Sequence, residues 1–320
     1  MSILVFAEHD NGNFKKSSFE AITYAQDLAV AKKLTVIAIV IGKVNSNLDE
    51  LGNYGANSII SVSGNQTSNF TTEAFSEILA KVALEQNANI LIFSNTYCGK
   101  SIAPRVAVKL NAGILSGVIS LADSDLVVKK TAFSNKAVAS TRLKSDKKVF
   151  CLTPNSYEIK NFGLSVTIHE IIIDIDAASI HTKTLKTSKA SGKVALTEAE
   201  IVVSGGRGMK GPENWGMIEE LADLLGAATA CSKPVSDMEW RPHSEHVGQT
   251  GITIKPNLYI AIGISGAIQH LAGVSSSKVI CVINKDAEAP FFKAADYGIV
   301  GDAFDILPKL IERAKQLKNS

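Results

Sequence analysis

The chain has 320 residues, of which 46% are hydrophobic and 20% are charged, and its 33 basic and 31 acidic residues give a net charge of +2. This length is sufficient for two domains that each bury a core, and the composition is that of a folded protein rather than a disordered one. The near balance of charge offers no basic surface for nucleic acid, so we expect no nucleic-acid partner.

The first ten residues have no basic segment and too short an apolar run for a signal peptide. The longest apolar run, near Leu34–Ile41, has the length of a strand, so we expect no membrane insertion. The four cysteines form no Cys-x-x-Cys pair and are far apart in the sequence: Cys98, Cys151, Cys231 and Cys281. This usage is typical of a reducing compartment, and we expect the protein to be cytoplasmic.

The first part of the chain alternates short apolar runs with amphipathic segments. The predicted strands are Ile3–Ala7, Leu34–Ile41, Ser58–Val62 and Asn89–Phe93, and the predicted helices are Ser18–Lys32, Thr71–Gln86 and Ala103–Leu110. Continuous apolar runs indicate strands buried on both faces, and apolar residues at three- and four-residue spacing indicate helices. This order predicts a parallel sheet in an α/β domain.

The segment Gly99-Lys100-Ser101 has the last three residues of a Walker phosphate-binding loop. That motif needs another glycine five positions before Gly99, where this chain has Ser94. Without it the loop cannot wrap a phosphate in the same way. We therefore interpret residues 95–101 as a loop that leads into the helix Ala103–Leu110.

From Leu126 onward the pattern changes to short β-rich runs separated by turn residues. These runs are Leu126–Lys130, Ala137–Thr141, Lys148–Thr153 and Leu164–Ile175. Because no helix of comparable length separates them, they predict antiparallel strands appended to the edge of the parallel sheet. The following segment, His181–Gly192, is polar and without periodicity, which is typical of a linker. We predict one domain at 1–192 and another at 193–320.

In the second domain the alternation of strands and helices returns. The predicted strands are Glu200–Val203, Ala227–Cys231, Asn257–Ile262 and Lys278–Ile283. Helices are expected at Asn214–Leu225, directly after Ile262 over Gly263–His270, and after Asp302. The chain is therefore predicted to contain two doubly wound, Rossmann-like α/β domains with mainly parallel sheets.

Two glycine-bearing turns follow strands of this second domain. The loop Ser204–Gly211 contains four glycines and Arg207, whose guanidinium suits phosphate oxygens. Its glycines do not follow the G-x-G-x-x-G order of nicotinamide-binding folds. In the second turn, Ser265 and Gly266 are interpreted as phosphate ligands at the start of a helix.

Residues in and near these segments also suggest two other chemistries. Gly263-Ile-Ser-Gly-Ala resembles a nucleophile elbow, but the only histidine after Ser265 is His270, five positions along the same expected helix. A hydrolase is therefore disfavoured. His243 and His246 could share a metal ion, yet no third ligand accompanies them, and we interpret them as surface or interface histidines. We expect neither a catalytic acid–base pair nor a metal site.

Several segments of the second domain together resemble the FAD-binding signature of the electron transfer flavoprotein α-subunit. They are Val247–Gly251, Leu258–Gly273, Ile283–Asp286 and Ala295–Asp302, with Ser204–Gly208 matching the family's upstream loop. In the first domain, Ala103-Pro-Arg-Val-Ala107 is similar, more loosely, to a helix of that family. This resemblance implies FAD as the cofactor.

The resemblance also implies roles for individual residues. Arg207, Ser232 and Lys233 would lie beside the FAD, and Val247, Gly248, Gln249 and Thr250 along its ring, with the Thr250 hydroxyl at N5. Gly263, Ser265, Gly266, Ala267, Ile268, Gln269 and His270 would surround the pyrophosphate and reach the pyrimidine end, with His270 near O2. Asn284 would contact the adenosine half and Asp302 the adenine end. A cation or helix start near O2 would stabilise an anionic reduced flavin.

One departure from the family pattern concerns Lys233, because the family usually has arginine at this position. Family arginines here lie over the flavin ring. Lysine keeps the charge but loses the planar fork and the stacking. We therefore expect the departure to affect the flavin potential more than flavin binding.

The family implies a function as an electron carrier rather than an enzyme with its own substrate. The chain would pair with a β-subunit that binds AMP, accept electrons from flavoprotein dehydrogenases such as the acyl-CoA dehydrogenases of fatty acid β-oxidation, and reduce a membrane quinone oxidoreductase. An electron-bifurcating member, with a second flavin in the β-subunit and NADH as donor, is one alternative. A nucleotide-binding regulatory protein without redox function is another, and Thr250 and His270 argue against it.

Overall fold

The computed structural model describes residues 2–133, 137–176, 180–182, 184–185 and 195–318. The chain divides into two compact units, each described by itself below. Unit 1 comprises Met1–Thr131 and Val138–Lys189, and unit 2 comprises Ala132–Ala137 and Ala190–Ser320. The predicted boundary at residue 192, and most of the predicted linker 181–192, lie outside the described residues. Among the described residues, no helix combines the length and apolarity needed to cross a bilayer.

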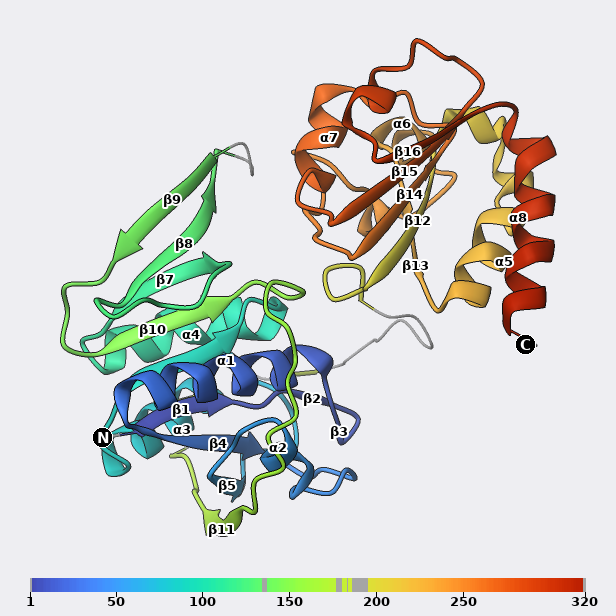
Figure 1. Ribbon diagram of the computed structural model, residues 1–320. Helices are drawn as coiled ribbons and strands as arrows, with labels where there is room; N and C mark the ends of the chain where they lie inside the picture. Colours follow the sequence, from blue (N-terminus) through green and yellow to red (C-terminus); the bar gives the residue numbers. More distant parts are fainter. Residues whose placement is uncertain (1, 134–136, 177–179, 183, 186–194, 319–320) are drawn as a thin grey trace. The chain divides into compact units, whose positions relative to one another are not determined.

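Within the described residues, unit 1 is built on a nine-stranded sheet with the order β11-β5-β4-β1-β6-β10-β7-β8-β9 (Figure 1). Its strands are β1 (Ser2–Phe6), β4 (Thr35–Ile41), β5 (Ser58–Ser63), β6 (Ala88–Ser94), β7 (Gly113–Val118), β8 (Val127–Ala132), β9 (Ala137–Arg142), β10 (Lys148–Leu152) and β11 (Thr167–Ile172). A separate two-stranded ribbon consists of β2 (His9–Asp10) and β3 (Asn13–Phe14). The central strand β1 pairs in parallel with β4 and β6, and all five of its residues are buried, which explains its continuous apolar run.

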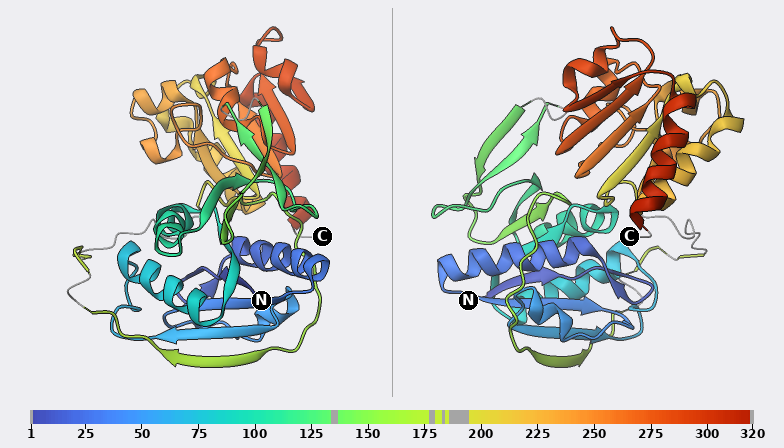
Figure 2. Two further views of the ribbon diagram at one scale, coloured as in Figure 1. Left: turned by 90° about the vertical axis from the view of Figure 1, so that its left-hand side faces the viewer. Right: turned by 45° about the vertical axis from the view of Figure 1, so that its right-hand side comes forward.

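Helices cover both faces of this sheet (Figure 2). They are α1 (Lys16–Lys32), α2 (Glu50–Asn53), α3 (Thr72–Glu85) and α4 (Tyr97–Lys109). The apolar side chains of α1 and α2 pack with one set of alternate strand residues, and those of α3 and α4 pack with the other set. This doubly wound α/β arrangement, with the antiparallel addition of β8 beside β7, confirms the fold class expected from the sequence.

Two of the four runs expected to be antiparallel are parallel strands. Strand β10 lies inside the sheet and pairs in parallel with both β6 and β7. Strand β11 pairs in parallel with β5 at the opposite edge. The prediction was wrong because it assumed that a helix must connect parallel strands, whereas here the chain returns to β10 after passing through β8 and β9. Strand β7 was not predicted, and four of its six residues are not fully buried.

The helix expected at Ala103–Leu110 begins earlier, at Tyr97. Thr96 is its N-cap residue, and the Thr96 Oγ1 accepts a hydrogen bond from the Gly99 N–H at 3.1 Å. This cap fixes the start of the helix in the segment that was interpreted as a loop. Pro104 lies inside the helix, which spans 13 residues in all.

Unit 2 contains a five-stranded parallel sheet with the order β13-β12-β14-β15-β16 among the described residues. Its strands are β12 (Ile201–Gly205), β13 (Ala228–Cys231), β14 (Leu258–Ile262), β15 (Val279–Asn284) and β16 (Tyr297–Val300), and its helices are α5 (Gly216–Leu225), α6 (Lys233–Asp237), α7 (Ile268–Val274) and α8 (Ala303–Lys318). Side chains of α5 and α8 pack on one face of the sheet, and those of α7 and the 3₁₀ turn Pro290–Ala294 lie on the other side. This second doubly wound unit was predicted.

The segment after β14 differs from its prediction as a continuous helix. Helix α7 begins only at Ile268, and residues 263–267 form an irregular turn. Gly263 and Gly266 have φ values of 62° and 82°, which a right-handed helix cannot contain. Ser265 and Gly266 therefore lie in this turn and not in the first turn of a helix.

Candidate cofactor-binding site

A cavity of about 490 Å³ opens at the carboxyl edge of the sheet of unit 2. It is lined by residues that follow four parallel strands, β12, β13, β14 and β15. The chain moves outward from β12 to β13 on one side and continues from β14 to β15 on the other, so the strand order reverses between β12 and β14. Open α/β sheets bind their ligands at such a reversal point.

At this point the loop after β12 crosses the loop after β14, and the two loops contact each other through backbone atoms. The Gly206 N–H donates to the Ile262 carbonyl at 2.9 Å, and the Gly208 N–H donates to the Gly263 carbonyl at 3.0 Å. A Cβ on Gly208 would lie 2.6 Å from the Gly263 Cα, and a Cβ on Gly206 would lie 2.2 Å from the Gly263 oxygen. Glycine is required at these positions because any side chain would separate the two loops.

A second wall of the cavity is the turn Val247–Gly251, which packs against α7. The Gln249 N–H donates to the Gln269 carbonyl at 2.7 Å. A Cβ on Gly273 of α7 would lie 2.5 Å from the Gly248 nitrogen, so glycine permits this close approach. The turn thereby presents Gln249 and Thr250, both exposed, at the rim of the cavity.

His270 lines the cavity from α7 and is 6% exposed. Its Nε2 lies 2.8 Å from the hydroxyl of the fully buried Tyr259. Its Nδ1 makes no hydrogen bond of regular geometry to any described residue. Burial and the neighbouring His246, opposed by the backbone of Val247, together lower the pKa of His270 to about 4. The ring is therefore uncharged at neutral pH.

The structure brings most of the predicted site residues together around this cavity. Its lining includes Arg207, Ser232, Lys233, Val247, Gly248, Gln249, Thr250, Gly263, Ser265, Ala267, Gln269, His270 and Asn284. The side chain of Asn284 also donates from Nδ2 to the Ile264 carbonyl at 3.0 Å and so holds the turn after β14. The contacts of these residues with a cofactor stay predictions.

Three predicted residues do not line the cavity: Gly266, Ile268 and Asp302. Gly266 packs against Phe291, and Ile268 is 61% exposed at the start of α7. Asp302 precedes α8 and accepts a hydrogen bond from the Phe304 N–H at 3.0 Å. This bond and the ammonium of Lys210, at 3.5 Å, lower the pKa of Asp302.

Five lining residues were not among the predicted site residues: Gly208, Pro234, His246, Ile264 and Asp286. Gly208 and Ile264 belong to loops that were singled out, and Asp286 lies two positions after β15, where parallel strands deliver ligand contacts. His246 was interpreted as a surface or interface histidine, and that is wrong, because it is 2% exposed. Its position directly before Val247, where the signature turn begins, was the feature of the sequence that could have indicated a place in the site.

The rejected chemistries find no support in the geometry. Within the described residues, no group of three or more His, Cys, Asp or Glu side chains could hold a metal ion. Ser265 is exposed, and the hydrogen-bonded partner of His270 Nε2 is Tyr259. His270 is therefore not arranged as the base of a nucleophilic serine.

The Walker-like segment of unit 1 is packed against the end of β6. Gly99 lies in the first turn of α4, where a Cβ would meet the Ser94 carbonyl oxygen at 1.8 Å. Glycine is needed here for contact between helix and strand. The segment Gly99-Lys100-Ser101 is helical and does not form a loop around a phosphate.

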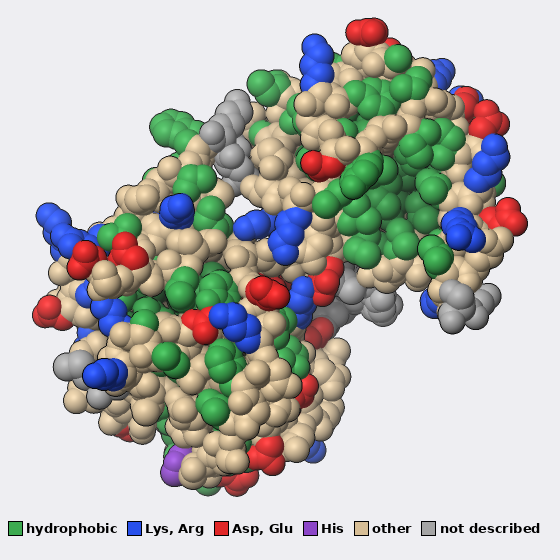
Figure 3. Space-filling view, viewed as in Figure 1, with side chains coloured by type: hydrophobic (Ala, Val, Ile, Leu, Met, Phe, Trp, Pro, Cys, Tyr) green, Lys and Arg blue, Asp and Glu red, His purple; other side chains and the backbone are tan. Residues whose placement is uncertain are grey.

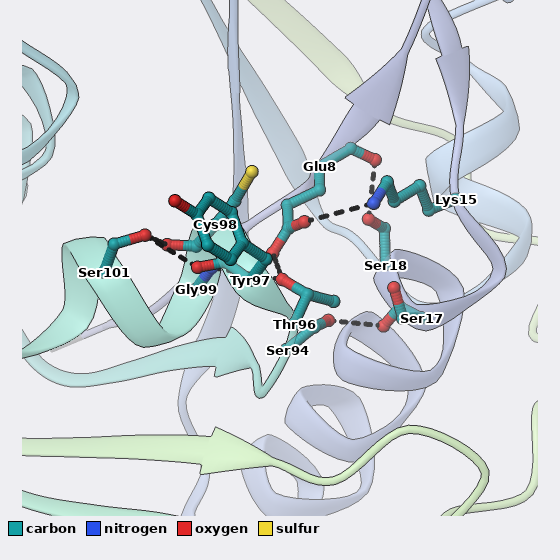
Figure 4. Close-up of polar contacts among 10 residues, drawn as sticks. All are labelled: Glu8, Lys15, Ser17, Ser18, Ser94, Thr96, Tyr97, Cys98, Gly99 and Ser101. Carbon is teal, nitrogen blue, oxygen red and sulfur yellow. Dashed lines mark hydrogen bonds and ion pairs between the residues drawn. The ribbon is translucent and has the colours of Figure 1, made fainter. Parts of the chain in front are cut away.

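The carboxyl edge of unit 1 is filled at β1 and β6 by its own side chains (Figure 4). Glu8 follows β1 and is 3% exposed. Its carboxylate accepts a hydrogen bond from Thr96 Oγ1 at 2.6 Å and lies 3.8 Å from Lys15 Nζ. An internal carboxylate thus occupies the space before the N-terminus of α4, where a ligand's anion would otherwise be favoured.

The residues of the cavity in unit 2 fit a flavin dinucleotide. Arg207 and Lys233 supply positive charge suited to phosphate, and the glycine crossing lets a ligand approach backbone closely. His270 lines the cavity, and its buried Nδ1 makes no hydrogen bond of regular geometry to any described residue. A volume of about 490 Å³ is within the usual range for cofactor sites.

Comparison with known proteins matches both parts of the chain. The model of the electron transfer flavoprotein domain matches residues 3–182, and that of the electron transfer flavoprotein FAD-binding domain matches residues 195–275. The electron transfer flavoprotein subunit alpha of Thermoanaerobacterium thermosaccharolyticum is 39% identical over 326 residues, which cover 99% of this chain and 98% of the relative. The Bacillus subtilis subunit is 37% identical, with 98% of each chain covered.

A mitochondrial electron transfer flavoprotein subunit alpha, from Dictyostelium discoideum, is 34% identical over 98% of this chain and 92% of its own length. The similarity therefore extends through both units and across bacterial and mitochondrial relatives. With the cavity at the carboxyl edge of unit 2 and the matched FAD-binding domain, it follows that the chain belongs to the electron transfer flavoprotein α-subunit family.

Proposed function

We propose that the chain carries FAD in the cavity of unit 2 and acts as the α-subunit of a heterodimeric electron carrier. The observation that carries this proposal is the convergence of the signature residues on one open cavity at the reversal point of the sheet. The identity to α-subunits over nearly the whole chain supports it. FAD bound there would supply reversible one- and two-electron redox chemistry.

The protein's own residues would bind and orient this cofactor. Arg207 and Lys233 would neutralise its negative charge, and the turn bearing Ser265 would present backbone and hydroxyl groups to the phosphates. Burial raises the pKa of Tyr259, which keeps its hydroxyl protonated. If this hydroxyl donates to His270 Nε2, the imidazole proton lies on Nδ1.

The expected partner is a β-subunit that binds AMP. Its presence is supported by apolar side chains that lie exposed over the sheet of unit 2 (Figure 3). In the edge strand β16, Tyr297 is 67%, Ile299 39% and Val300 60% exposed. An apolar edge strand left in water promotes association with other chains, so a covering partner is favoured.

For the electron path, we propose flavoprotein dehydrogenases such as acyl-CoA dehydrogenases as donors, as in fatty acid β-oxidation. A membrane quinone oxidoreductase would be the acceptor, and the carrier would work in the cytoplasm. The relatives' name, electron transfer flavoprotein subunit alpha, supports a carrier that works with a second subunit.

The test is to co-produce the chain with its partner subunit, reconstitute the pair with FAD and record its visible spectrum. We expect a yellow protein that is bleached by a reduced acyl-CoA dehydrogenase and re-oxidised by a quinone oxidoreductase. A protein that stays colourless after reconstitution would contradict the proposal. Two flavins per heterodimer together with NADH oxidation would instead identify the bifurcating alternative.

A further inference from the structure

His246 is buried in the wall of the cavity beside the turn that carries Gln249 and Thr250. It is 2% exposed, and it lines the cavity directly. Its ring occupies space left by two glycines: a Cβ on Gly251 would lie 2.8 Å from Nδ1, and a Cβ on Gly248 would lie 3.4 Å from Nε2. The imidazole is thus held in a fixed place by the backbone of the turn.

This imidazole is available for proton chemistry. Its Nδ1 makes no hydrogen bond to any described residue, although the atom is buried. Burial lowers the pKa of His246, so the ring is uncharged at neutral pH. A buried polar atom without a partner is costly in a folded protein, and such atoms often have a functional reason.

The charges acting on the ring come from the elements packed around it. His243 and Lys233 lower the pKa of His246 further, and Asp237 of α6 raises it. The other neighbours add little charge: His270 of α7 is neutral, and burial raises the pKa of Cys231 in β13 to about 12. The carboxylate of Glu245 is already bound to the Arg241 guanidinium, at 2.6 and 2.8 Å. A negative charge placed in the cavity would therefore have a large effect on the pKa of His246.

A path for protons from solvent reaches this ring. His243 is exposed, and the centroid of its ring lies 5.2 Å from that of His246. An exposed imidazole is in contact with water and can pass protons between solvent and a neighbouring ring. The two histidines thus connect bulk solvent with the wall of the cavity.

We propose that His246 takes up one proton from solvent when one electron is delivered to the cofactor in this cavity. This inference rests on the proposed function, since it needs FAD in the cavity and a reduced dehydrogenase as electron donor. The electron adds one negative charge to the site, and the proton forms one new N–H bond on the imidazole, so the net charge of the site does not change. When the electron leaves for the acceptor, the same proton returns to solvent.

The physical reason is linkage between the two charges. An anion within a few ångströms favours the imidazolium form, and by reciprocity the imidazolium favours the reduced cofactor. His270 is less suited to this role because Tyr259 already occupies its Nε2. Both rings have a buried Nδ1 without a hydrogen bond to the described residues, and His246 also has the exposed His243 beside it.

The test is to measure the midpoint potential of the first electron against pH in the FAD-loaded heterodimer. For the wild type we expect a fall of about 59 mV per pH unit, which is the value for one proton per electron. His246→Gln, which fills the space without titrating, should make this potential independent of pH. The control His243→Gln should keep the slope and slow only the proton exchange.

Direct proton uptake provides a second measurement that does not depend on any variant. Photoreduction of the wild-type heterodimer by one electron in weakly buffered solution, with a pH indicator present, should remove about one proton from solvent per flavin. A pH-independent wild-type potential, an unchanged slope in His246→Gln, or no proton uptake would each overturn the inference. Failure of the proposed function is separate, because it would be seen as a heterodimer that does not bind FAD.

Discussion

The carboxyl edge of the sheet is filled by side chains in unit 1 and open in unit 2. Both have parallel strands whose carboxyl ends meet at a point where the strand order reverses. In unit 1 the chain leaves β1 through Glu8, whose buried carboxylate is bound by Thr96. In unit 2 the chain leaves β14 through Gly263, and a cavity of about 490 Å³ opens there. The architecture thus provides a potential site in each unit, and the residues directly after the strands decide whether it is open.

The strongest way to break this comparison is to add a side chain at the crossing in unit 2. In Gly263→Ala the new Cβ would lie 2.7 Å from the Gly208 Cα, and the φ of 62° would be strained. We expect a loss of about 4 kcal/mol in the stability of unit 2 and loss of bound FAD. Calorimetry and flavin content would measure both effects.

A matched control is Gly226→Ala, where the glycine has the same φ of 62° but no atom within 4 Å of the new Cβ among the described residues. It should cost only about 1–2 kcal/mol, with FAD retained. Equal effects of the two substitutions would show that backbone strain, and not the closeness of the two loops, is what matters at Gly263.

Acid should destabilise unit 2 through His270. The folded pKa is about 4, below the ordinary value of about 6.5, so between these values the unfolded chain binds a proton that the folded chain does not. Stability is therefore lost as pH falls from about 6.5 to 4, by about 3 kcal/mol in total. The described histidines of unit 1, His9, His169 and His181, are not buried.

The measurement is the melting temperature of unit 2 between pH 7 and pH 4 in the wild type and in His270→Gln. The variant should lose much of the dependence on pH above pH 4. If the two curves are parallel, the acid sensitivity has another origin.

In unit 1, Glu8→Gln should weaken the closed edge. The amide keeps the shape but loses the charge that the Thr96 hydroxyl and Lys15 stabilise. We expect a loss of about 2 kcal/mol in the stability of unit 1, measured by calorimetry, with flavin content unchanged. Glu77→Gln, which removes an exposed partner of Lys109, is the control and should cost at most about 0.5 kcal/mol. A loss of FAD in Glu8→Gln would contradict the separate roles of the two edges.

The smallest effect is expected for Lys233→Arg, at the rim of the open edge. A planar guanidinium over the flavin ring would add a cation–π contact of about 0.5–1 kcal/mol and favour the reduced form. This corresponds to a rise of roughly 20–40 mV in the one-electron potential, measured by spectroelectrochemical titration. An unchanged potential would mean that residue 233 points away from the ring.

The sequence predicted the parts of the fold that local patterns determine. The run Ile3–Ala7 is nearly the observed β1, because a strand buried on both faces must be apolar throughout. Part of the site could also be predicted, because glycines and polar residues directly after buried parallel strands meet at one edge of the sheet. This is why Arg207 and Ser265 lie around one cavity, whereas the place of His270 in it was implied by the family resemblance.

What could not be predicted depends on long-range packing. The position of β10 inside the sheet follows from its pairing with β6 and β7. Both of these strands are far from β10 in the sequence. The start of α4 depends on the Thr96 cap, and the burial of His246 depends on space left by Gly248 and Gly251. None of these contacts leaves a periodic pattern in the sequence.

The crossing of the 206–208 loop with Gly263 consists of main chain only. A contact made by main chain alone has no side-chain rotamers to rearrange, so its shape should depend little on substitutions around it. Substitutions at the rim and wall, such as at Lys233 and His246, should therefore alter the surroundings of the cavity without moving this crossing. In the proposed FAD site, the backbone crossing would then determine the shape that binds the cofactor, and the side chains around it would adjust its redox potential.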